Sequence, residues 1–208
     1  THKRIGGDVR VFDPVAGGEA LLVIDVRTRA LVAFADPATG TLRLACASGE
    51  KVLVFDPVAG GGALLVLATG SEVKALAVFE EPATSAPRLA CGSEGKVHVF
   101  DAVSGGEALL VIDAGSDQLG PLVVFKDLAT GAPRLAIISA SWCVGKVFIF
   151  DLVAGGEALV KLDLGAASGE KALTTFADPV TGGPRLVSGM TDVRVWNPAA
   201  SAAAIEAE

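Results

Sequence analysis

Short apolar runs of about four to eight residues recur along the chain, and polar turn segments separate them. Residues 31–34, 73–79 and 96–100 are such runs, and they alternate or are rich in β-branched side chains. Runs of this kind are typical of strands and are too short for helices. Between them, segments such as 13–18 and 56–61 read Asp-Pro-x-x-Gly-Gly, which favours hairpin loops because proline fixes φ and glycine accepts a positive φ. The pattern predicts an all-β protein.

The apolar runs belong to a tandem repeat of about 45 residues. The segment that begins at Val9 recurs with near-identity from Val52, Val97 and Val147. Aromatic residues mark two fixed positions of the repeat. They are Phe12, Phe55, Phe100, Phe150 and Trp196 in one series, and Phe34, Phe79, Phe125 and Phe176 in the other. Because eight of the nine phenylalanines are repeat positions, we expect them in the core.

Each repeat contains four predicted strands, which indicates a small antiparallel sheet. The chain begins with the last two strands of a unit, at 9–13 and 20–25, and three complete units follow. The final unit has three strands, at 172–177, 185–189 and 193–197. We expect one repeat domain over residues 1–208, with units at approximately 9–50, 51–95, 96–145 and 146–192 and a partial unit at 193–208.

Two features of the repeat resemble the WD-repeat β-propeller family. Where that family has Trp-Asp, four units end a strand with Phe-Asp, at 12–13, 55–56, 100–101 and 150–151, and the fifth has Trp196-Asn197. An Arg-Leu-Ala-x-x-Ser run occupies 43–48 and 88–93, with looser versions at 134–139 and from Arg185. The resemblance implies an all-β propeller of four-stranded antiparallel blades. The family's connector histidine is missing at 26–29, 69–72, 115–117 and 165–170, so its Trp-Ser/Thr-His-Asp tetrad is absent in every blade, and packing is expected to hold the blades together.

The strand count allows about four to five blades, and three arrangements follow from it. In a small closed ring, residues 20–25 would lie beside 193–197 and complete the last blade. Alternatively, two chains share one ring, or the chain is an open arc that a partner holds. An open arc exposes strand edges, which natural proteins normally cover.

Charge and cysteine content exclude several classes of function. Seventeen Lys and Arg face 24 Asp and Glu, a net charge of −7, which disfavours nucleic acid and anionic membranes as partners. No apolar stretch approaches the roughly 18 residues of a membrane span. Cys46, Cys91 and Cys143 read as free thiols, the first two buried, in an intracellular, reducing compartment, cytoplasmic or organellar. No Cys–His spacing suits zinc, and we expect no metal or cofactor.

The polar repeat positions have structural explanations. Arg43, Arg88, Arg134 and Arg185 could together bind an anion, but pairing with an acidic neighbour in the same blade is the favoured interpretation. The aspartates at 13, 56, 101 and 151 are expected to accept backbone hydrogen bonds in turns. His98 occupies an ordinary variable strand position. We therefore expect no enzymatic activity.

One loop departs from the repeat. Between Ser139 and Lys146 the chain is longer than in the preceding unit and contains Trp142, Cys143 and Val144. A tryptophan at a hairpin tip is costly to leave in water and is favoured at interaction hot spots. These three residues are the candidate contact point for a protein partner or another protomer. The alternative is that Trp142 folds back on its own blade.

The sequence thus predicts a non-catalytic scaffold, or a structural subunit of a larger assembly, that binds through the loop faces of a WD-repeat-like propeller. The expected partner is another protein or a second copy of this chain. The alternative is a small lectin-like propeller that binds carbohydrate. Such a site would place an aromatic residue in every blade, whereas this chain has no tyrosine and Trp142 is unique.

Overall fold

The computed structural model describes residues 7–115, 119–140, 144–166, 172–189 and 192–198. Its strands form five antiparallel sheets. The first two sheets contain β1 (Val9–Val11) and β2 (Leu22–Ile24), then β3 (Leu31–Ala35), β4 (Leu42–Ser48), β5 (Lys51–Phe55) and β6 (Leu65–Ala68). The third contains β7 (Val73–Glu80), β8 (Pro87–Ser93), β9 (Lys96–Asp101) and β10 (Leu110–Asp113). The last two contain β11 (Leu119–Lys126), β12 (Pro133–Ala140), β13 (Val144–Asp151) and β14 (Val160–Ala166), then β15 (Ala172–Ala177), β16 (Pro184–Gly189) and β17 (Val193–Trp196).

Each sheet is a meander in which strands that follow one another in the chain pair side by side. The register repeats as well, since Leu44 lies opposite Phe55 and Leu89 lies opposite Phe100. Two strands, three complete sheets and a final three-stranded sheet follow in the order that the sequence predicts. Within the described residues, no helix has the length and apolar character needed to cross a membrane.

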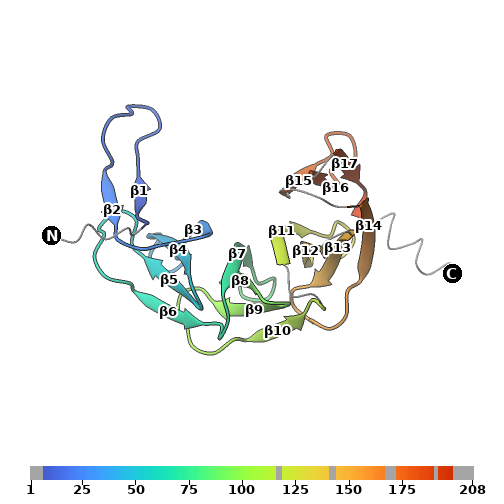
Figure 1. The fold of residues 1–208 in the computed structure, drawn as a ribbon, viewed down its shortest axis with the longest axis horizontal. Coiled ribbons are helices and arrows are strands. Elements are labelled where there is room, and N and C mark those ends of the chain that lie inside the picture. The colour runs from blue at the N-terminus through green and yellow to red at the C-terminus, as the bar shows by residue number, and fades with distance from the viewer. Residues whose placement is uncertain (1–6, 116–118, 141–143, 167–171, 190–191, 199–208) are drawn as a thin grey trace.

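The sheets stand side by side around an arc (Figure 1). Their first strands face the inside, where β3 contacts β7, β7 contacts β11, and β11 contacts β15. The sheets β1–β2 and β15–β17 form the two ends, which stand apart in this view (Figure 1). β2 pairs with β1, so residues 20–25 do not complete the last sheet as they would in the small closed ring. One chain by itself thus forms an open arc, which is compatible with a ring shared by two chains and with an arc that a partner holds.

Apolar side chains fill the spaces between neighbouring sheets. In the cluster between β3–β6 and β7–β10, Phe34 and Val54 come from one sheet and Leu89 and Phe100 from the next. The other interfaces repeat this arrangement with equivalent residues. Because a strand presents alternate side chains to opposite faces, a sheet in the middle of the arc contributes to two clusters. The expectation that repeated phenylalanines form the core is therefore met wherever a sheet has neighbours on both sides.

Candidate functional site

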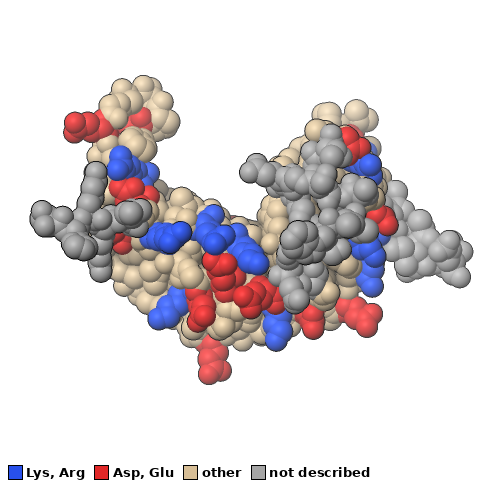
Figure 2. Space-filling view, viewed as in Figure 1, with Lys and Arg blue, Asp and Glu red and all other residues tan. Residues whose placement is uncertain are grey.

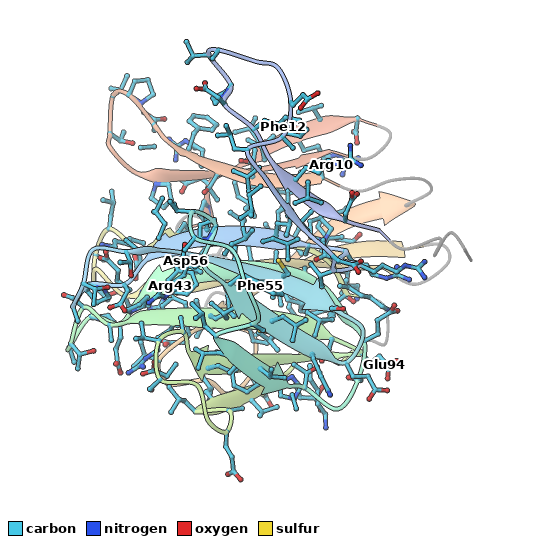
Figure 3. All side chains as sticks on the ribbon, turned by 90° about the vertical axis from the view of Figure 1, so that its left-hand side faces the viewer. Arg10, Phe12, Arg43, Phe55, Asp56 and Glu94 are labelled. Carbon is cyan, nitrogen blue, oxygen red and sulfur yellow. The ribbon has the colours of Figure 1, made fainter. Side chains whose placement is uncertain are left out.

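Two hairpin loops from each complete sheet emerge at the same edge of the arc. In an antiparallel meander, the loop between the first and second strands and the loop between the third and fourth strands lie at one end of the sheet. We call this edge the hairpin face. It comprises loops 36–41, 81–86, 127–132 and 178–183, together with loops 13–18, 56–61, 101–106 and 151–156. Figure 3 shows Arg43 and Asp56 at this edge and Glu94 at the opposite one.

Aspartate side chains fix the loops of the hairpin face. Asp56 Oδ1 accepts hydrogen bonds from the amides of Val58 and Ala59, both at 2.8 Å. These bonds hold the pKa of the Asp56 carboxyl below its ordinary value. The same caps recur at Asp13, Asp101, Asp151 and Asp178. The turn role that the sequence predicts for the aspartate series is confirmed.

Each repeated arginine ties the two loops of its own sheet together. Arg43 lies between Asp36 and Asp56, with nitrogen to oxygen distances of 3.6 and 3.8 Å. In the same way, Arg88 pairs with Glu81 and Asp101, and Arg134 with Asp127 and Asp151. The predicted pairing within the blade is thus confirmed. What the sequence interpretation missed is the second carboxylate, although an acidic residue precedes each arginine by seven positions.

The last sheet has a reduced version of this arginine clamp. Arg185 pairs with Asp178 at 2.7 Å. Asn197 directly follows β17, the third strand of the last sheet, at the position where the other sheets have the second aspartate. Among the described residues, Asp178 is the one carboxylate that forms an ion pair with Arg185. The Arg185 clamp therefore has one negative charge fewer than the other three.

The pKa values of the clamp carboxylates Glu81 and Asp101 lie below their ordinary values. The Thr84 hydroxyl and then Arg88 lower the pKa of Glu81. Burial raises the pKa of Asp101, but amide hydrogen bonds from Ser104 and Val103 outweigh it, so the net direction is downward. In the part of the chain that the structure describes, no group of histidine, cysteine, aspartate and glutamate side chains is placed to hold a metal ion. These acids hold the loops of the hairpin face through amide hydrogen bonds and ion pairs with the arginines.

Exposed apolar side chains stand at the tips of these fixed loops. Val15, Val58 and Val153 occupy the same position in three loops and are 94%, 77% and 53% exposed. Leu128 and Val180, in the first hairpin loops of the last two sheets, are 63% and 91% exposed. Single exposed apolar side chains are ordinary on protein surfaces, and it is contiguous apolar areas that mark interaction sites.

A cavity of about 370 Å³ opens between the sheets β11–β14 and β15–β17. Its apolar wall includes Phe125, Leu128 and Ile149, and its charged wall includes Arg134 and Arg185. Val160 also lines it. At the equivalent point of earlier interfaces the larger Leu22 and Leu110 contact a loop glycine, Gly60 and Gly155 respectively. At this interface Val160 stands at the position of these leucines and lines the cavity.

The face opposite the hairpin face is charged. Positive and negative side chains lie next to one another there, with no large area of one sign (Figure 2). Arg29 and Glu72 form an ion pair at 2.8 Å in this region. The described part of this face offers no extended basic surface for a phosphate backbone.

The three residues predicted as a partner contact cannot be placed together. Trp142 and Cys143 lie outside the described residues. Val144 is the first residue of β13 and pairs in register with Ala166 of β14. A role for this loop in binding therefore stays a prediction.

The remaining candidate residues are structural. Cys46 and Cys91 are buried free thiols, as predicted, and burial raises the pKa of Cys46 to about 11. Cys143 lies outside the described residues. His98 lies in β9, where Nδ1 is 3.3 Å from the Ser93 hydroxyl and the ring stacks on Phe100. Burial, and then the nearby Lys96, lower its pKa. His98 is thus a packed strand residue, as its repeat position indicates.

Comparisons with known proteins show the fold. No protein-family model and no curated protein matches the chain. Among solved structures, it is similar to BBS1N in complex with ARL6DN, from a crystal soaked with mercury, with a TM-score of 0.63 and 15% identity over 91% of this chain. It is also similar to the Dos1 propeller, with a TM-score of 0.62 and 13% identity over 91% of this chain. The protein has a β-propeller fold of antiparallel blades, and it spans 58% and 50% of the length of these two chains.

Proposed function

We propose that this protein is a non-catalytic interaction scaffold, or a structural subunit of a larger assembly, that binds a protein partner through the hairpin face. The observation that carries the proposal is the combination of exposed apolar loop tips with the adjacent cavity. Leu128 is both exposed and part of the cavity wall, and Val180 lies next to Thr181, another lining residue. Together these residues form an apolar area with a recess.

The rigidity of the loops favours binding. Asp178 caps its loop through the amides of Val180 and Thr181 at 2.9 and 3.0 Å and also pairs with Arg185. A loop that is already fixed loses little conformational entropy when a partner binds, so more of the contact energy remains as affinity. The cavity is large enough to accept an apolar side chain, and well-packed apolar anchors in pockets dominate many interfaces.

The structural neighbours are consistent with this role. One of them is a BBS1N structure determined in complex with a protein partner, ARL6DN. At 15% identity this similarity extends to the fold alone. It supports a protein partner as the class of ligand and gives no indication of which protein that is.

A binding experiment with matched variants tests the proposal. A partner is first isolated from the natural source by cross-linking, purified and titrated against the chain by calorimetry. The variant Leu128→Ser with Val180→Ser should weaken binding at least about tenfold, which corresponds to roughly 1.4 kcal/mol for an interface anchor. Circular dichroism should show an unchanged strand spectrum, because both residues are exposed.

The control places charge away from the hairpin face. Val66 and Val111 are exposed on the outer strands β6 and β10, and the equivalent residue of β14 is Lys161. Val66→Lys with Val111→Lys should therefore fold normally and bind as the unmodified chain does. If this control loses binding while the Leu128 and Val180 variant binds fully, the interface lies on the outer strands. That result would refute the proposal.

A further inference from the structure

One repeated aromatic position is buried in the middle of the arc and exposed at its beginning. The third-strand residues Phe55, Phe100 and Phe150 are 6%, 1% and 2% exposed. Phe12, which directly follows β1 at the same repeat position, is 51% exposed. The residue type and the repeat position are the same, so the difference in exposure comes from which sheets lie beside each phenylalanine.

The other end of the arc shows the same change. The first-strand residues Phe34, Phe79 and Phe125 are between 7% and 9% exposed, whereas Phe176 of β15 is 47% exposed. On β17, Val193 and Val195 are 75% and 59% exposed. Their equivalents in β5, Val52 and Val54, are fully buried. Phe176, Val193 and Val195 thus form an exposed apolar surface on the last sheet.

These two surfaces are the two sides of the interface found between neighbouring sheets. In the cluster between the second and third sheets, Phe34, Val52 and Val54 of one sheet pack with Phe100 of the next. Phe176, Val193 and Val195 correspond to the first group, and Phe12 corresponds to Phe100. The face that ends the chain therefore has the composition that packs against the face that begins it.

We infer that two copies of this chain associate head to tail, with the Phe12 side of β1–β2 in one copy packed on the β15–β17 face of the other. The two ends of one arc stand apart, so a single chain does not bring these surfaces together (Figure 1). A second arc, turned about a two-fold axis, meets both ends.

The mass of the purified full chain measured by light scattering tests this association. We expect twice the chain mass of 20.9 kDa, with the dimer persisting on dilution. Phe12→Asp and Phe176→Asp should each raise the dissociation constant at least tenfold, because each places a carboxylate in the apolar contact. Val58→Asp, on the exposed hairpin face, is the matched control and should leave the mass unchanged.

Mixing the two variants distinguishes a head-to-tail contact from other contacts. In a dimer of Phe176→Asp with Phe12→Asp, one of the two contacts pairs an intact Phe12 with an intact Phe176, and the other contact carries both carboxylates. The mixture should therefore associate more tightly than either variant does alone, which also shows that both variants are folded. A mass of 20.9 kDa for the unmodified chain overturns the inference, as does a Phe176→Asp variant that dissociates no more readily on dilution than the unmodified chain. Neither result affects the proposed hairpin face, which uses other residues.

Discussion

The indole Nε1 of Trp196 donates a hydrogen bond to the Ser188 hydroxyl at 2.9 Å, across the strand pair β16–β17. In two earlier sheets the equivalent pairs are Phe55 with Cys46 and Phe100 with Cys91. The last sheet therefore has both the tryptophan donor on its third strand and the serine acceptor on its second strand. A partial polar link is present in the last sheet, although the histidine of the WD-repeat tetrad is missing from the connectors.

This relationship predicts a strong coupling between the two residues. Ser188→Ala removes the acceptor and leaves a half-buried indole N–H without a partner, which should cost about 1–3 kcal/mol of the free energy of unfolding. Trp196→Phe with Ser188→Cys recreates the pair of the second and third sheets and should cost less than the sum of the single changes. Urea unfolding of Trp196→Phe, of Ser188→Cys and of the variant that carries both changes measures the coupling. Strictly additive effects would show that the hydrogen bond contributes nothing.

The arginine clamps predict a difference between sheets. Arg88 serves two carboxylates and Arg185 one, so Arg88→Met should lower the free energy of unfolding more than Arg185→Met does. For partly buried pairs we expect about 1–3 kcal/mol for Arg88, because two carboxylates lose their partner. Equal losses in urea unfolding would contradict the importance of the second carboxylate.

The reduced clamp also predicts a stabilising substitution. Asn197→Asp restores the residue that the other sheets have at this position and gives Arg185 a second negative charge. We expect a gain of up to about 1 kcal/mol, which thermal unfolding at low salt should show and 1 M salt should reduce. A loss of stability at low salt would mean that the cavity wall does not accept the charge.

Stability should fall in two steps as the pH is lowered. The pKa of His98 is below its ordinary value of 6.5, so the folded state binds its proton less readily than the unfolded chain, and stability decreases as the pH falls from 6.5 toward the lowered value. The carboxyls of Glu81, Asp101 and Asp127 have pKa values below the ordinary 4.5 and 3.8. Their contribution is present above those values and is lost as the pH falls below them.

Substituting the histidine separates the two steps. His98→Leu places in β9 the residue that β5 has at Leu53, and it should remove the first decrease while leaving the second. The free energy of unfolding in urea, measured from neutral to acidic pH, is the readout. An unchanged slope just below pH 6.5 would assign the first step to another group.

Two adjacent glycines predict different costs of adding a methyl group. Gly155 and Gly156 have φ values of 68° and 85°, so alanine is strained at both, by about 1–2 kcal/mol. A Cβ at Gly155 would also lie 2.7 Å from Leu110 Cδ1, whereas one at Gly156 meets no atom within 4 Å. Gly155→Ala should therefore be the more destabilising change in urea unfolding. Leu110→Val, which copies Val160, should rescue part of that loss, and no rescue would argue against this contact.

Much of the local structure follows from the sequence alone. The alternation of apolar residues, the proline and glycine of the turns and the repeat of Phe-Asp fix the strands, their order and the capped hairpins, because each depends on residues close together in the chain. The pairing of Arg88 with acids of its own sheet can be predicted from the sequence for the same reason. The repeated spacing also contained the signal for the second carboxylate, since Glu81 precedes Arg88 by seven positions, but a motif-by-motif interpretation missed it.

The tertiary structure alone decided how the sheets assemble. Phe12 and Phe100 occupy the same repeat position in nearly identical segments, yet one is half exposed and the other buried. Burial depends on which sheet lies beside the residue, and the curvature and the ends of the arc determine that. The cavity beside Val160 arises in the same way, since it depends on how two sheets meet and on no pattern within either strand. Local chemistry therefore defined each blade, and packing between blades created the surfaces available for binding.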